Sequence, residues 1–274
     1  MPPDPTTGVC FEQLDGLPVY QLAQWREQPR LVHAVFTRLG GVSAPPYATL
    51  NLSQSVGDDP RAVAINHQRV YAALGVRAEQ VATCHLTHSA RAFVIVSFNQ
   101  TGLLGQGDIL VTACPGIYLY MRFADCLPIL LYDPVRAAVG LAHAGWRGTL
   151  QNVAGCAVQA MTEGLGCRAR DLQAVIGPGI GPCCYEVGED VIQVARAAFG
   201  DDEAILRPTG GQRAVFDLRQ ANRQQLLAAG VRQVAIMDLC TACHPELFFS
   251  HRAERGRTGR FGVIIGYRDG ESGS

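Results

Sequence analysis

Short, continuous apolar runs alternate along the chain with longer segments in which polar and apolar residues are mixed. The apolar runs predict β-strands over residues 31–38, 92–97, 108–112, 116–121, 128–132, 137–142, 231–237 and 261–265. The mixed segments predict helices over residues 60–73, 148–164, 187–200 and 218–229. Asp59 and Asp217 stand at the N-cap positions of two of these helices, and Pro60 suits the first helical position.

The spacing of the predicted elements sets the fold class. Several neighbouring strands are too close in sequence to hold a crossover helix between them, so hairpins must coexist with α/β units. We therefore expect an α/β fold, α+β-like because of the hairpins, with mixed β-sheets flanked by helices in a single layered domain over residues 1–274. Residues 1–30 are loosely patterned, and we expect them at the periphery or in an early hairpin. Residues 207–212 are rich in turn formers and predict an exposed loop.

Composition and charge narrow the class of ligand. The chain is 48% hydrophobic and 17% charged, and no apolar run is long enough to span a membrane. A net charge of -1 gives no broad positive field, so we expect neither a membrane nor a nucleic-acid partner, but a small molecule. Every basic side chain is an arginine, which excludes Schiff-base chemistry and a P-loop lysine. An anionic ligand must therefore be bound by arginines or backbone amides.

The cysteines bear on the cellular compartment. The first residues lack the basic start and apolar core of a secretory signal, so we expect a cytoplasmic protein whose ten cysteines are thiols, thiolates or metal ligands. The adjacent residues Cys183 and Cys184 fit this view, because neighbours rarely reach disulfide geometry. Residues 240–244 match the pattern of c-type haem attachment, but attachment requires export and the context of a redox CxxC is missing. We interpret Cys240 and Cys243 as buried thiols near a strand end.

Candidate metal ligands stand beside the central predicted strands. His143 lies where an apolar strand runs into a glycine-punctuated turn, and Cys126 lies at the head of another strand, so one sheet can bring the two together. His85 and His88 precede the strand that starts at residue 92. Three mixed Cys/His ligands with an open fourth position are typical of catalytic zinc. The alternative is structural: a hydrogen-bonded core histidine, a small apolar cysteine and a surface histidine.

A series of short motifs runs along almost the whole chain. They occupy residues 36–38, 40–43, 46–47, 50–52, 124–129, 143–148, 176–181, 183–188, 216–218 and 248–252. In this order they resemble the bacterial laccase-domain family, also called multicopper polyphenol oxidases. Members of that family have been reinterpreted as zinc-dependent purine nucleoside phosphorylases with adenosine deaminase activity.

The resemblance implies a ligand set of one zinc ion, with copper as the alternative metal. Cys126 comes from the Ala-Asp-Cys motif and His143 from the His-Ala-Gly-Trp-Arg-Gly motif. His88 is the third ligand that the resemblance implies. The family usually has Gln-x-His-Gly there, whereas this chain has Leu-Thr-His-Ser over residues 86–89, so His85 stays a rival.

The resemblance also implies the reaction and its participants. Adenosine, inosine and methylthioadenosine would react with phosphate to give a free base and ribose 1-phosphate. The candidates for binding the phosphate are Arg147, as a catalytic residue, and Arg38, as a substrate-binding residue. Asn51 is the candidate for binding ribose or base edges. Asp125 is the candidate carboxylate for proton transfer in deamination by a zinc-activated water. Alternatively, Asp125 orients His143 or accepts hydrogen bonds from backbone amides.

Two other activities remain open at this stage. A metal-free hydrolase or deamidase could use Cys126 and His143 as nucleophile and base. A copper polyphenol oxidase, which the older family name implies, needs more histidines than the seven present can arrange. Residues 176–181 lack the pattern of a nucleotide fingerprint and predict a tight loop that approaches substrate or shapes the pocket wall. We expect a monomer or a homodimer.

Overall fold

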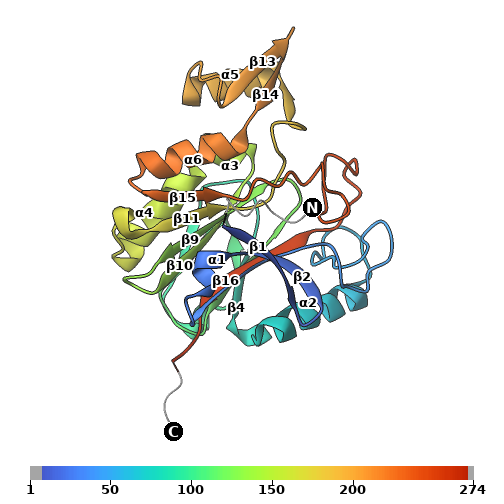
Figure 1. The fold of residues 1–274 in the computed structure, drawn as a ribbon, viewed down its shortest axis with the longest axis vertical. Coiled ribbons are helices and arrows are strands. Elements are labelled where there is room, and N and C mark those ends of the chain that lie inside the picture. The colour runs from blue at the N-terminus through green and yellow to red at the C-terminus, as the bar shows by residue number, and fades with distance from the viewer. Residues whose placement is uncertain (1–7, 271–274) are drawn as a thin grey trace.

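The structure is a computed structural model that describes residues 8–270 of the chain. Two mixed β-sheets pack face to face, and helices cover both outer faces of the pair (Figure 1). This arrangement confirms the predicted α/β class with mixed sheets and hairpins. Within the described residues, no helix combines the length and apolar character needed to cross a membrane.

The first sheet has seven strands and is antiparallel except where β4 pairs with β6 and β8. In spatial order its strands are β1 (Val9–Leu14), β2 (Leu17–Leu22), β3 (Leu31–Phe36), β16 (Phe261–Tyr267), β8 (Tyr118–Phe123), β4 (Val81–His85) and β6 (Gly102–Gln106). The predicted early hairpin is present as β1 and β2, and β2 is largely buried. Residues 1–7 lie outside the described part of the chain.

The second sheet has six strands and carries the residues that matter most for function. In spatial order they are β15 (Gln233–Ile236), β11 (Gln173–Ile176), β9 (Leu127–Asp133), β10 (Ala138–Ala144), β7 (Ile109–Thr112) and β5 (Ala92–Ile95). The two edge strands pair in parallel with their neighbours, and the central pairs are antiparallel. Strands β9 and β10 are buried along their whole length, which explains why the sequence shows them as continuous apolar runs.

Helices cover the outer face of each sheet. The helices are α1 (Ala23–Arg26), α2 (Pro60–Leu74), α3 (Trp146–Leu150), α4 (Val153–Leu165), α5 (Glu189–Phe199) and α6 (Leu218–Ala228), with short 3-10 turns at η2 (Ala78–Gln80), η3 (Phe98–Gln100) and η4 (Ala169–Asp171). α2 packs on the seven-stranded sheet, while α3, α4 and α6 cover the six-stranded sheet. Asp59 and Asp217 cap α2 and α6 as predicted, because each carboxylate accepts an N–H of the first turn.

The single helix predicted over residues 148–164 is wrong, because the segment forms two helices. Asn152 between α3 and α4 adopts a left-handed conformation with φ of +60°. The end of α3 is held by α6: Gln225 Nε2 donates to the carbonyl of Thr149 (2.6 Å), and Asn222 Nδ2 donates to its hydroxyl (2.9 Å). These long-range contacts favour a break that local propensity does not reveal.

A small third sheet stands apart from the two-sheet body together with α5 (Figure 1). Its strands are, in order, β12 (Glu186–Gly188), β14 (Arg213–Phe216) and β13 (Leu206–Gly210). The loop predicted over residues 207–212 is exposed as expected, but most of it is strand β13, which pairs with β14 as a hairpin. Ladder hydrogen bonds therefore override the turn-forming composition of this segment.

The loop before α2 is held in place by one buried amide, that of Asn66. Its Nδ2 lies within hydrogen-bond distance of Ser43 Oγ (2.9 Å) and the carbonyl of Asn51 (2.8 Å). Its Oδ1 accepts the N–H of Val42 at 2.9 Å. This amide joins both ends of the loop to α2.

We predict that Asn66→Ala lowers the free energy of unfolding by about 1–3 kcal/mol, because it leaves buried backbone groups without partners. Urea unfolding followed by circular dichroism measures this. The matched control is Gln68→Ala, which removes an exposed amide from the same helix and should leave stability nearly unchanged. Equal losses in the two variants would contradict the assigned role of Asn66.

Candidate metal centre

Strand register brings the thiol of Cys126 beside the imidazole of His143. In the β9–β10 ladder, His143 pairs with Pro128 and Ala144 pairs with Leu127. Cys126 directly precedes β9, so continuing the register places it opposite Gly145. Gly145 is two residues after His143 in the chain. The sequence expectation that a single sheet joins these two residues agrees with this geometry.

His88 completes a group of three candidate ligands. One ligand atom from each of His88, Cys126 and His143 lies within 4.8 Å of the others. His88 Nε2 is 3.8 Å from Cys126 Sγ, and the two imidazole rings meet edge to face with centroids 5.0 Å apart. The rival His85 lines the same pocket but is not part of this group.

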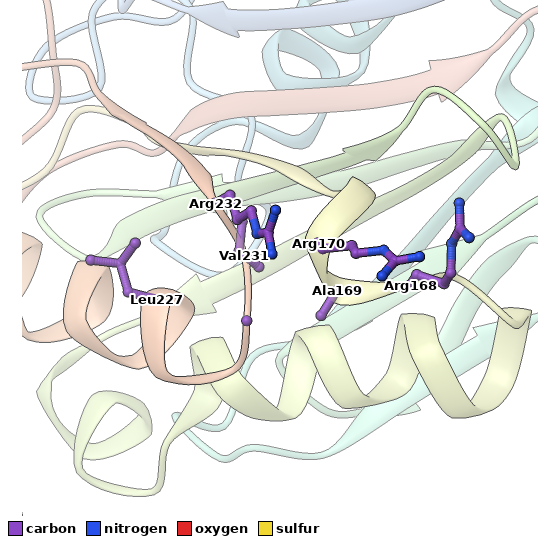
Figure 2. A pocket seen from close by; sticks show the side chains of 7 residues that line it. Arg168, Ala169, Arg170, Leu227, Val231 and Arg232 are labelled. Atoms are coloured by element: carbon purple, nitrogen blue, oxygen red, sulfur yellow. The ribbon is translucent and has the colours of Figure 1, made fainter.

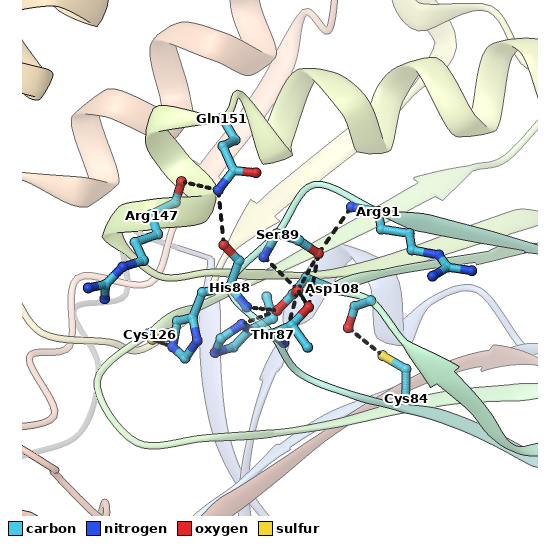
Figure 3. Close-up of polar contacts among 11 residues, drawn as sticks. Cys84, Thr87, His88, Ser89, Arg91, Asp108, Cys126, Arg147 and Gln151 are labelled. Carbon is cyan, nitrogen blue, oxygen red and sulfur yellow. Dashed lines mark hydrogen bonds and ion pairs between the residues drawn. The ribbon is translucent and has the colours of Figure 1, made fainter.

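The carboxylate of Asp108 holds both histidines of the group. Oδ1 accepts the ring Nδ1–H of His143 (2.8 Å) and the backbone N–H of His88 (3.0 Å). Oδ2 accepts the backbone N–H groups of Thr87 (3.1 Å) and Ser89 (2.7 Å) and also their hydroxyls (Figure 3). These bonds stabilise the left-handed backbone of His88, whose φ is +59°.

Asp108 also decides which nitrogen of His143 would bind a metal. Because Nδ1–H donates to an ionised carboxylate, Nε2 is the nitrogen left to bind a metal ion, which would replace the proton there. Burial alone would raise the pKa of Asp108, but the hydrogen bonds from His143 and the Ser89 amide hold it well below its usual range. The carboxylate is therefore charged throughout the physiological pH range.

Cys126 and His143 lie so close together that the proton is held by the imidazole and the sulfur is left as a thiolate. Burial would raise the pKa of the Cys126 thiol, yet His143 and His88 lower it to about 6. Burial would also lower the pKa of His143, yet the charges of Cys126 and Asp108 raise it to about 9. Near neutral pH the metal-free protein thus contains a thiolate beside an imidazolium, and a bound metal ion would replace the imidazolium proton.

The three candidate ligands open into a pocket of about 540 Å³. Three arginines line it, namely Arg122, Arg252 and Arg260. Tyr185 and Ile180 form part of its wall. The glycine-rich loop over residues 176–181 therefore shapes the pocket wall, which is one of the two roles expected for it. A pocket of this size suits a small-molecule ligand.

Asp125 lies in this pocket with both carboxylate oxygens already hydrogen-bonded. Oδ1 accepts the hydroxyl proton of Thr241 and Oδ2 accepts the backbone N–H of Arg252, each at 2.7 Å. Its φ of +85° places it in the left-handed region. These contacts match the structural alternative that the sequence left open, in which the acid accepts backbone amides.

The structure does not bring the other three candidate residues to the pocket wall. The guanidinium of Arg38 donates to the carbonyls of Ala48 and Pro245 and stacks on Phe249. Asn51 is completely buried, and its Oδ1 accepts the backbone N–H groups of Ser53 and Arg260.

Arg147 stacks on the ring of Trp146, with its guanidinium carbon 4.1 Å from the ring centroid, and lines an adjacent depression. Arg38, Asn51 and Arg147 are therefore not among the residues that line the pocket, whereas Arg122 and Arg260 line it and are not among the residues that the sequence predicts. No local signal distinguishes the latter two from ordinary strand and loop arginines.

A second depression lies away from the candidate ligands, with a volume of about 800 Å³ (Figure 2). Arg170 of η4, Arg168 directly before η4 and Arg232 directly before β15 line it. Its lining residues include no histidine, cysteine or acid, so the metal-ligating chemistry of the described chain is concentrated elsewhere.

Gly145 leaves room for the ligand group. A Cβ atom at this position would lie 2.8 Å from both Cys126 Sγ and His88 Cδ2, which is closer than real carbon contacts allow. Its φ of -80° is open to any residue, so the requirement for glycine is one of space. At Gly148, by contrast, a Cβ would meet its nearest neighbour at 3.4 Å, an ordinary contact.

We predict that Gly145→Ala abolishes metal binding at this centre while the protein stays folded, because the added methyl pushes Cys126 and His88 apart. Elemental analysis of the purified variant, with circular dichroism as the folding check, measures this. Gly148→Ala is the matched control in the same motif and should keep its metal. Full metal content in Gly145→Ala would show that the ligand group is placed wrongly.

We also predict that, in metal-free protein, iodoacetamide alkylates Cys126 with a rate that is half its plateau near pH 6. The thiolate is the nucleophile, so the rate is flat above pH 7 and falls as acidification protonates it. The rate for an ordinary thiol would instead reach half its plateau at about pH 8.5. Peptide mass spectrometry of the pH series measures the rate, and a curve with the ordinary midpoint contradicts the assigned ion pair.

Known proteins share this fold and much of this sequence. A purine nucleoside phosphorylase from Deinococcus radiodurans is 43% identical over 243 residues, covering 88% of this chain and 92% of the relative. The purine nucleoside phosphorylase YlmD from Bacillus subtilis is 32% identical over 92% of this chain and 95% of the relative.

The crystal structure of YlmD from Geobacillus stearothermophilus superposes with a TM-score of 0.88 at 35% identity, over 94% of this chain and 99% of that one. A hypothetical protein, YfiH of Bacillus licheniformis, gives a TM-score of 0.86 at 33% identity over 93% and 98%. The sequence pattern of a known family also matches residues 32–268. The chain therefore belongs to the family described as multi-copper polyphenol oxidoreductase laccase.

Proposed function

We propose that this chain is a cytoplasmic, zinc-dependent purine nucleoside phosphorylase. It would convert adenosine, inosine or methylthioadenosine and phosphate into a free base and ribose 1-phosphate. One observation carries the proposal: the His88, Cys126 and His143 group lies in a pocket that three arginines also line. The names of the relatives from Deinococcus and Bacillus support the same reaction.

The residues present fit a zinc ion. Zinc accepts both borderline imidazole and soft thiolate donors, and three such protein ligands beside an open pocket are the pattern of catalytic zinc. Gly145 keeps the space between the ligands clear, and Asp108 orients His143 as a carboxylate commonly does for a zinc-bound histidine. When bound, zinc would supply a Lewis acid at its open position.

The arginines provide the charge that phosphorolysis requires. A phosphate oxygen forms a bond to the anomeric carbon of ribose, the bond from that carbon to the purine nitrogen breaks, and the bonding electrons leave with the base. Arg122, Arg252 and Arg260 surround the pocket with positive charge that would bind the phosphate dianion. Burial lowers the pKa of Arg260. Because the usual pKa of arginine lies far above neutral, the guanidinium keeps its charge.

Adenosine deamination would be a side activity of the same pocket. It needs a carboxylate that moves protons between water and the purine amine. Asp125 is the acid that lines the pocket, and proton transfer there would compete with its bonds to Thr241 and Arg252. This competition favours phosphorolysis as the main reaction.

A metal-free Cys/His hydrolase is the second candidate. The low pKa of Cys126 and the raised pKa of His143 would make the thiolate a ready nucleophile without metal. A copper polyphenol oxidase would need further histidine ligands, and only two potential metal-ligand groups occur within residues 8–270.

We predict that protein purified without added metal contains zinc and forms ribose 1-phosphate from inosine and phosphate. Cys126→Ser and His143→Ala should each lose metal from this centre and turnover together, since both ligands are needed. Chromatography of the products and elemental analysis measure these outcomes. Activity that survives complete zinc removal, but not alkylation of Cys126, would favour the hydrolase.

We predict that Arg122→Gln lowers kcat/KM for phosphate by roughly 10- to 100-fold, the loss expected for one charge-assisted hydrogen bond. Initial rates at varied phosphate concentration measure this, and the KM for inosine should change less. Arg168→Gln, in the depression of Figure 2, is the matched control and should keep wild-type kinetics. An effect on inosine alone would place the phosphate elsewhere.

A further inference from the structure

Four cysteines that are distant in sequence meet beside the pocket wall. Cys183 and Cys184 lie in the loop before β12, and Cys240 and Cys243 lie in the loop after β15. All four sulfurs lie within 4.8 Å of one another, and Cys243 Sγ is 3.4 Å from the sulfurs of both Cys183 and Cys184. All four are free cysteines.

From this geometry we propose that Cys183, Cys184, Cys240 and Cys243 bind a second, structural zinc ion. Four thiolates are a set that selects zinc over harder cations. With Zn–S bonds of about 2.3 Å, the sulfurs of a tetrahedral site are about 3.8 Å apart, so small side-chain adjustments suffice. The protein would fill every position around this ion, and a closed site of this kind is structural.

The alternative of disulfides fits the arrangement less well. A disulfide needs sulfurs at about 2.05 Å, and Cys243 is equally close to two partners, of which it could join one. The remaining pair would then include one of the adjacent residues Cys183 and Cys184, together with Cys240. A tetrathiolate site uses all four sulfurs at once and requires no choice of partner.

The backbone around the cluster donates a hydrogen bond to a sulfur and leaves space for the sulfurs, as a group of thiolates requires. The N–H of Gly181 donates to Cys240 Sγ at 3.2 Å, and such bonds stabilise negative charge on a metal-bound sulfur. A Cβ at Gly181 would come 3.3 Å from Cys183 Sγ and 3.2 Å from Cys240 Cβ, so glycine gives the sulfurs space. The carbonyl of Cys240 accepts the N–H of Cys243 at 3.2 Å, which closes the turn that aims both sulfurs the same way.

The position of the cluster gives the second ion a role in shaping the catalytic pocket. Thr241, between two of the proposed ligands, donates to Asp125, and Asp125 is next to Cys126. On the other side, Cys184 immediately precedes the pocket residue Tyr185 and the strand β12. A metal ion here would fasten the base of the small third sheet to the pocket wall.

Zinc stoichiometry of the full-length chain, purified under reducing conditions without added metal, tests the proposal. Wild type and the control Cys10→Ser, a half-buried cysteine of β1, should each hold about two equivalents of zinc. Cys126→Ser and Cys243→Ser should each hold about one, and the double variant about none. Cys243 is exposed, so its replacement leaves the core intact.

Site-resolved alkylation separates the two ions. In Cys126→Ser, zinc should protect the cysteines of the cluster, and a chelator should expose them and lower the melting temperature. In Cys243→Ser, zinc should still protect Cys126. The proposal is overturned if Cys243→Ser keeps the zinc content of wild type, or if intact mass and peptide maps show a disulfide within the cluster. Neither readout depends on phosphorolysis, and if the catalytic zinc were absent, wild type would hold about one equivalent and Cys243→Ser about none, so the two failures remain distinguishable.

Discussion

The carboxylate of Asp108 is completely buried, and it accepts hydrogen bonds from both histidines of the candidate metal centre. A buried charge of this kind is tolerated only when it is fully hydrogen-bonded. Here the turn that carries His88 and the ring of His143 provide the donors. One charge therefore sets the backbone of one ligand and the tautomer of another, and the remaining geometry of the centre follows from it.

The two-sheet body supplies the rigidity that this arrangement needs. Asp108 directly precedes β7, which pairs with β10, and β10 pairs with β9. The N–H of His143 donates to the carbonyl of Asp108 at 2.8 Å, so the pair is joined through the main chain as well as the side chains. Both faces of the central strands are covered, one by the other sheet and one by helices. Cys126 and His143 thus lie at the ends of two paired strands, and Asp108 ties the turn that carries His88 to them.

The central strands could be predicted because burial on both faces leaves a continuous apolar run in the sequence. The three candidate ligands could be proposed because two observations agreed. Strand adjacency connected Cys126 with His143, and the resemblance to a known family added His88. Asp108 could not be recognised, since an acid before a strand is common and its partners come from two other segments. The substrate-binding candidates Arg38 and Asn51 stand in motifs, yet in the fold their polar atoms make hydrogen bonds to distant backbone groups and neither residue lines the pocket.

The cluster of four cysteines also could not be predicted from the sequence, because its members come from two distant loops. The sequence predicts that Cys240 and Cys243 are buried thiols; the prediction holds for Cys240 and is wrong for Cys243, which is exposed. Their partners Cys183 and Cys184 come from a loop about sixty residues earlier, so no spacing rule for compact zinc sites could connect them. Only the pairing of the two loops, through Gly179 and Cys240, brings the four sulfurs together.

The central claim is that Asp108 prepares a zinc site at His88, Cys126 and His143. It is tested most directly by the zinc concentration that half-protects Cys126 from alkylation, compared between wild type and Asp108→Asn. Peptide mass spectrometry of Cys126 reports this site alone. We predict that the variant needs about 10- to 100-fold more zinc, the usual loss when a carboxylate partner of a metal-bound histidine is removed. Equal protection curves for the two proteins would contradict the account.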